Sequence, residues 1–91
     1  MMVSAQELQF QWHQRGYSFS LWHDPPGQVW HDFVHPTDEV FMLLTGEITL
    51  TIHGQTLYPK PGEEIKIPAN TPHTIRNIGL TENCWCFGYK H

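Results

Sequence analysis

His35, Glu39 and His73 carry side chains that could together hold one divalent metal ion. His35 and Glu39 are four residues apart, about 13 Å in an extended chain, which is too far for both to bind one ion. Because residues 36–38 (Pro-Thr-Asp) are typical of a turn, Glu39 can return on an adjacent strand, about 5 Å away. His73 follows a loop, residues 68–72, that begins and ends with proline, so its entry into a strand is restricted. Two imidazoles and one carboxylate form a ligand set that leaves coordination positions open for substrate or water.

The elements that must position these side chains are predicted to be short strands behind one helix. Ser4 and Glu7 form a capping box and Gly16 stands where a left-handed residue would end a helix, so we expect a helix over residues 4–15. From Tyr17 onward, short apolar runs are separated by turn sequences roughly every eight to twelve residues, which is typical of an all-β sandwich or barrel. We expect strands over residues 17–22, 29–34, 39–44, 47–52, 56–58, 64–67, 74–76 and 84–89. No linker or repeat interrupts them, which predicts one domain over residues 1–91 with its β-barrel over 17–89.

Alternation within one strand places Trp85, Phe87 and Tyr89 on the same face. Because aromatic side chains supply much of the apolar area in small cores, this pattern favours core filling over a platform on which a ligand stacks.

The composition narrows the partners that we expect. A net charge of -4 with five scattered Lys and Arg residues argues against a nucleic-acid partner, since binding to phosphates requires clustered basic residues. No apolar run approaches the roughly 20 residues needed to cross a membrane, and the first four residues lack the features of a signal peptide. Cys84 and Cys86 are expected to be reduced thiols, which favours a cytoplasmic location. Exposed strand edges and a core limited by 91 residues favour a homodimer.

Two segments, residues 27–46 and 68–77, resemble the two sequence motifs of the cupin superfamily. The first motif reads G-x5-H-x-H-x3-E-x6-G, and it is matched here by Gly27, His35, Glu39 and Gly46. The family's first histidine is replaced by Phe33, which removes one of four expected metal ligands. The second motif ends P-x-G-x2-H-x3-N, and it is matched by Pro68, His73 and Asn77. Asn70 replaces a glycine there, and Asn is the next most tolerant residue of a left-handed turn.

This resemblance implies a jelly-roll β-barrel, also called a double-stranded β-helix, with the short N-terminal helix in addition. It also implies that His35, Glu39 and His73 bind a divalent metal, with Fe, Mn, Ni and Zn all open. Cupins include dioxygenases, decarboxylases, isomerases, epimerases and non-catalytic binding proteins, so the resemblance selects a site rather than a reaction.

Two functions therefore stay open for the small molecule that the barrel is expected to hold. In the first, the chain is a metal-dependent oxygenase or isomerase in which His31 or Tyr89 assists proton transfer. In the second, it is a non-catalytic binding or sensing module whose metal site is degenerate or structural, which Phe33 favours. The side chains expected to line the pocket are those of His31, Phe33, Trp30, Phe41, Trp85 and Phe87.

Overall fold

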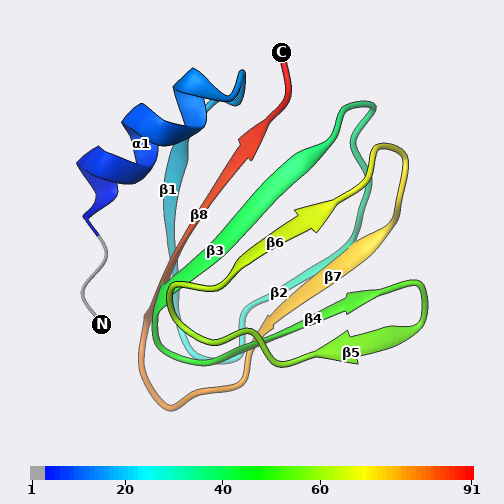
Figure 1. The fold of residues 1–91 in the computed structure, drawn as a ribbon. Coiled ribbons are helices and arrows are strands. Elements are labelled where there is room, and N and C mark those ends of the chain that lie inside the picture. Colours follow the sequence, from blue (N-terminus) through cyan, green and yellow to red (C-terminus); the bar gives the residue numbers. More distant parts are fainter. Residues whose placement is uncertain (1–3) are drawn as a thin grey trace.

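Eight strands lie in residues 4–91, the part of the chain that the computed structural model describes, and they form two antiparallel sheets (Figure 1). The first sheet contains, in spatial order, β1 (Ser20–Asp24), β8 (Asn83–Tyr89), β3 (Glu39–Thr45) and β6 (Glu64–Ile67). The second contains β2 (Val29–Phe33), β7 (His73–Asn77), β4 (Ile48–Ile52) and β5 (Gln55–Leu57). Each predicted strand overlaps one of these strands, so the expected all-β jelly-roll architecture is confirmed. Residues 1–3, which contribute to the expectation of no signal peptide, lie outside the described residues.

The N-terminal helix α1 (Ala5–Gln14) packs on the outer face of the first sheet (Figure 1). Its predicted start is confirmed, because the Ser4 hydroxyl accepts a hydrogen bond from the Glu7 backbone N–H at 3.4 Å. Leu8 and Trp12 are buried against Val40 and neighbouring side chains of the sheet. Within residues 4–91 no helix is long and apolar enough to cross a membrane.

The main core lies between the two sheets. Its buried members alternate along the strands, as the predicted patterns require, and they are Phe41, Leu43, Ile48, Leu50, Ile52, Ile67, Ile75 and Trp85. Strand β3 is buried on both faces, since Phe41 and Leu43 face this core while Val40 and Met42 face α1. Two-sided burial explains why β3 is a continuous apolar run rather than an alternating one.

The loops before β3 and β7 meet at one end of the molecule (Figure 1). The Asn70 backbone N–H donates to the His35 carbonyl at 2.6 Å, and the Ala69 N–H donates to Asp38 Oδ1 at 2.9 Å. These hydrogen bonds hold His35 close to the first residues of β3 and β7. Asn70 has φ +59°, so the left-handed conformation expected from its place in the motif is confirmed.

The conformation of Asn70 predicts how substitutions there change stability. We expect Asn70→Gly to leave the free energy of unfolding nearly unchanged, because glycine adopts positive φ without strain. Asn70→Val should lower it by about 1–2 kcal/mol, because a β-branched side chain is strained there. Both variants retain the backbone N–H that reaches His35, so the difference isolates the effect of φ. Equal urea midpoints for wild type and Asn70→Val would contradict this reading of the loop.

Candidate metal centre

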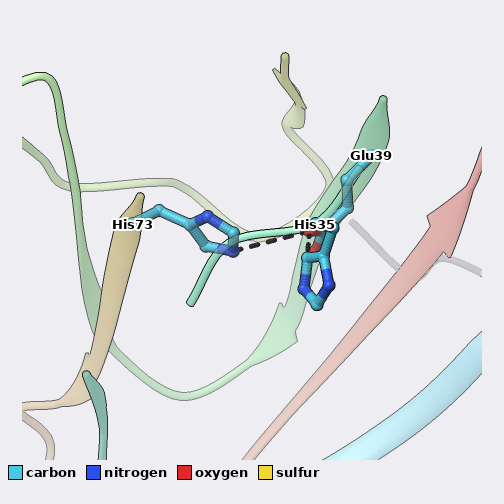
Figure 2. Close-up of side chains that lie close together, drawn as sticks. All are labelled: His35, Glu39 and His73. Atoms are coloured by element: carbon cyan, nitrogen blue, oxygen red, sulfur yellow. Dashed lines mark ion pairs between the residues drawn. The ribbon is translucent and has the colours of Figure 1, made fainter. Parts of the chain in front are cut away.

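His35, Glu39 and His73 come together where the two sheets meet, as the sequence predicted. His35 lies in the loop between β2 and β3, Glu39 begins β3 in the first sheet, and His73 begins β7 in the second. Glu39 Oε1 is 3.7 Å from His35 Nε2 and 3.5 Å from His73 Nε2, and Figure 2 shows both imidazoles approaching the carboxyl group. One potential ligand atom from each residue lies within 4.8 Å of the others. A single ion can therefore reach all three.

The Glu39 carboxyl group tests whether a cation fits between these side chains. Glu39 is 3% exposed, and its Oε1 atom has no hydrogen-bond partner within residues 4–91. A buried oxygen without a partner is costly, and a bound cation is one way to satisfy it. Ligand bonds of about 2.0–2.2 Å require ligand atoms roughly 3.0–3.4 Å apart, so separations of 3.5 and 3.7 Å need only a small contraction. The residues present fit a divalent metal ion.

His73 is held in the tautomer that a metal ligand needs. Its Nδ1 atom is 3.0 Å from the Thr71 carbonyl oxygen, which can only accept, so Nδ1 carries the proton and donates it. The Nε2 lone pair is then free on the side that faces Glu39. A backbone carbonyl that orients a histidine in this way is the usual support of a metal-binding imidazole.

Burial changes the proton affinities at this centre. It raises the pKa of Glu39 to about 7, and it lowers the pKa of His35, with a smaller contribution from the nearby His73. His35 is thus favoured in the neutral form that can bind a metal, while the Glu39 carboxylate lacks a compensating positive charge. A divalent ion would supply that charge.

Tyr89 and Phe33 border the same centre. The Tyr89 hydroxyl is 3.0 Å from His35 Nε2, and burial raises the pKa of Tyr89 to about 12, with a smaller effect of Glu39, so the phenol keeps its proton. Because His35 Nε2 has a single lone pair, a metal bound to this nitrogen would replace a hydrogen bond donated to it by Tyr89. Phe33 is paired with His73 between β2 and β7, and its ring centroid is 5.9 Å from that of His35 and 6.2 Å from that of His73. The side chain that replaces the first motif histidine therefore lies beside the other ligands.

A pocket extends from these residues along the inner side of β8. Next to His35, Glu39 and His73, which we call the triad, is a cavity of about 40 Å³. It adjoins a more open cavity of about 210 Å³. Besides the imidazole of His35, the larger cavity is lined by six aromatic side chains: Trp22, Trp30, Phe33, Trp85, Phe87 and Tyr89. Trp85 also packs in the core, so the aromatic row of β8 both fills the core and lines the pocket.

Two expected pocket residues lie elsewhere. His31 has 68% of its side chain exposed and lies 3.4 Å from Asp32 Oδ2, outside the pocket. The cause is a β-bulge between Trp30 and Phe33, where Asp32 has φ +50°, because the extra residue breaks the alternation that was assumed for β2. The placement of Phe41 in the pocket is also wrong, since it is fully buried behind Trp85 in the core.

The sequence interpretation missed Trp22 and Asp24. Trp22 lies directly opposite Trp85 in the β1–β8 ladder, so its place in the pocket depends on a strand pairing that was not predicted. Asp24 lies beyond the strand expected over residues 17–22, but it ends β1 and is 2% exposed. A buried aspartate followed by Pro-Pro-Gly carries no local signal that separates it from a turn residue.

Comparisons with known proteins agree with this fold. Residues 20–86 match the family model Cupin_2, described as a cupin domain. A pyrimidine/purine nucleoside phosphorylase of Geobacter metallireducens is 33% identical over 64 residues, which are 68% of this chain and 60% of that protein. This chain therefore spans less than two thirds of that relative's length.

Two solved structures are similar over most of this chain. Oxalate oxidase in complex with the substrate analogue glycolate has a TM-score of 0.75 and 25% identity, covering 84% of this chain and 42% of the oxidase chain. A predicted oxalate decarboxylase from Thermotoga maritima has a TM-score of 0.75 and 20% identity, covering 97% of this chain and 74% of its own.

The raised pKa of Glu39 predicts how stability depends on pH without metal. Between pH 4.5 and about 7 the folded state holds a proton that the unfolded state has lost, so stability is present at low pH and falls as pH rises through 7. With a chelator present, we expect wild type to lose roughly 3 kcal/mol across this range relative to Glu39→Gln, whose amide does not titrate. Both proteins contain His35 and His73, so the difference between their curves reports Glu39 together with its coupling to these two imidazoles.

The control for this measurement is Glu47→Gln, at an exposed position that takes part in none of the ion pairs of residues 4–91, and its curve should follow that of wild type. Urea unfolding at pH 5, 6, 7 and 8 gives the three curves. Parallel curves for wild type and Glu39→Gln would contradict the burial of an unpaired carboxyl group.

Proposed function

This chain belongs to the cupin domain family, and we propose that it binds one divalent metal ion through His35, Glu39 and His73. The metal is Fe, Mn, Ni or Zn in this proposal, and the adjoining aromatic pocket holds the small organic molecule on which the protein acts. The reaction that we propose is that of a metal-dependent oxygenase or isomerase. The single observation that carries the proposal is the buried Glu39 oxygen without a partner between two imidazoles.

Each residue of the site has a task in this proposal. A bound metal supplies a Lewis acid that polarises an oxygen of the ligand. His73, oriented by the Thr71 carbonyl, and the buried Glu39 provide a rigid part of the binding set. Phe33 limits the access of water from the open cavity. Tyr89 keeps its proton near neutral pH, lies 3.0 Å from His35 Nε2 and is the proton donor in this proposal.

The names of the relatives support a small ligand but no particular reaction. The oxalate oxidase structure contains glycolate, a small organic acid, and shares 25% identity with this chain. Nucleoside phosphorolysis requires a binding site for phosphate, whereas the side chains that line the described pocket include no Lys or Arg. For that reason we do not propose the activity of the Geobacter relative for this chain.

A non-catalytic binding or sensing protein is the second candidate function, and Phe33 favours it. Phe33 offers apolar surface where the family motif has a metal ligand, so the site has three protein ligands at most from the motif positions. In this case the metal would hold one end of the ligand without a reaction. The cytoplasmic location and the homodimer stay predictions.

Metal content tests the proposed function. We expect untagged wild-type protein, purified without chelator or affinity metal, to contain about one metal ion per chain by elemental analysis. His73→Ala should lose most of it, because a rigid ligand with a fixed tautomer is removed. The matched control is His31→Ala, which removes an exposed histidine and should retain the metal. Absence of metal from wild type even after incubation with Fe, Mn, Ni and Zn, or full retention in His73→Ala, would contradict the proposal.

The position of Phe33 predicts the effect of restoring the motif histidine. Phe33→His should tighten metal binding about 10- to 100-fold, because an imidazole already placed beside His35 and His73 adds a ligand with little ordering cost. Without metal the same variant should be less stable than wild type, because the partly buried Phe33 ring loses apolar contact area. Competition with a chromophoric chelator measures the affinities. Phe33→Leu is the control for lost aromatic area, and equal affinities of the His and Leu variants would show that position 33 does not face the ion.

A further inference from the structure

Three tryptophans that line the aromatic pocket donate hydrogen bonds to one buried carboxyl group, that of Asp24. Asp24 Oδ2 accepts from the indole N–H of Trp30 at 2.9 Å and of Trp85 at 3.0 Å, while Oδ1 accepts from Trp22 at 3.1 Å. The three indoles come from β1, β2 and β8, so Asp24 joins strands of both sheets. Further hydrogen bonds link its backbone to the side chains of Asn77 and Asn83, which fix its position.

These hydrogen bonds determine what the three tryptophans can offer a ligand. Each indole has a single donor, and all three donors are used by Asp24. What remains toward the cavity is ring surface: Trp30 stacks on Phe33 with centroids 5.4 Å apart, and Trp22 meets Trp30 edge-on at 6.0 Å. This end of the pocket therefore favours a ligand group that needs no hydrogen bond.

The charge distribution favours a positive group over a neutral apolar one. Among residues 4–91, Asp24 takes part in none of the ion pairs, and its side-chain partners are neutral indoles. No Lys or Arg lines the cavity. Hydrogen bonds from indole N–H to a carboxylate add electron density to the rings, whose faces already attract cations. A buried negative group behind aromatic faces is complementary to a positive charge that is spread over apolar surface.

The cavity is accessible and small. Trp22 is 44% exposed and Trp30 is partly exposed, so a ligand can enter from solvent on this side. A volume of about 210 Å³ is below the roughly 300–1,000 Å³ of pockets for drug-sized molecules. Phe87 and Tyr89 extend the aromatic lining from Trp85 to His35. The ring centroids are 5.4 Å apart for Trp85 and Phe87, 5.6 Å for Phe87 and Tyr89, and 4.5 Å for Tyr89 and His35.

We infer that Trp22, Trp30 and Trp85, held by Asp24, form a subsite for a small organic cation, namely a methylated ammonium group. The inference rests on the proposed function in one respect, since the cation is one end of the small molecule whose other end reaches the triad. The triad itself is not needed for the cation to bind.

Choline and 3,3-dimethylbutan-1-ol test the subsite, because they share a shape and differ in the positive charge. We titrate each into ¹⁵N-labelled protein in the presence of a chelator and follow the indole N–H signals at constant ionic strength. We expect choline to shift the signals of Trp22, Trp30 and Trp85 and to bind about 5- to 30-fold more tightly than the alcohol. Trp12, on the buried face of α1, is the internal control and should not respond.

Variants separate the ring faces from the charge. Trp22→Leu, at a half-exposed position, should weaken choline binding at least about fivefold, whereas Trp22→Phe should retain most of it because an aromatic face remains. Phe10→Leu, which removes an exposed aromatic ring from α1, is the control and should bind choline as wild type does. Asp24→Asn should remove the preference for choline over the alcohol if the variant is folded.

The outcomes distinguish this inference from the proposed function. Choline binding by a protein that takes up no metal would support the subsite and contradict the metal proposal. Equal affinities for choline and the alcohol, or no response of the three indoles, would overturn the subsite whatever the metal content. Indole signals that shift with protein concentration alone, and no longer respond to choline, would assign this face to contact between copies of the chain and would also overturn it.

Discussion

The Glu39 carboxyl group is the constraint on which the rest of the site depends. It lies at the first residue of β3, where the two sheets meet, and it is almost fully buried with one oxygen unpaired. Burying such a group costs several kcal/mol unless a partner compensates it. In this fold the Nε2 atoms of His35 and His73, from two neighbouring segments, lie within 3.7 Å of Glu39 Oε1. The metal that we propose would bind this unpaired oxygen and supply the positive charge that the buried carboxylate lacks.

A second buried carboxyl group, that of Asp24, lies behind the tryptophans of the pocket, and the two groups are compensated in different ways. Asp24 accepts three indole N–H bonds, whereas Glu39 Oε1 accepts none within residues 4–91. Asp24 therefore acts as a structural centre that orients the aromatic walls, while Glu39 remains available to a cation. Between them the β8 row of Trp85, Phe87 and Tyr89 lines a pocket that has no Lys or Arg in its lining. A molecule in this pocket would meet aromatic surface at one end and the triad at the other.

Sequence reasoning was most accurate where the physical cause was local. Eight predicted strands overlap the observed ones, the Ser4 cap begins α1, and Asn70 has the positive φ that its loop requires. It failed at His31, where strict alternation was assumed for β2. The bulge that turns His31 outward depends on how β2 pairs with β7, and one strand's pattern does not contain that information. Phe41 was misplaced for a similar reason, since its position behind Trp85 depends on the β3–β8 pairing.

The sequence by itself determined the family, the positions of the strands along the chain and the three candidate metal ligands, because turn residues and motif spacing are local properties of the chain. Tertiary structure decided which hydrogen-bond partners those side chains have and which pocket residues lie beside them. The Thr71 carbonyl that orients His73 is two residues away, but the unpaired state of Glu39 depends on every element around it. The Asp24 cluster depends on contacts between residues 61 apart, such as Asp24 and Trp85, that only the pairing of β1 with β8 creates. Burial and long-range pairing are properties of the packed chain. They place the candidate metal ligands at one end of a pocket whose other end is aromatic.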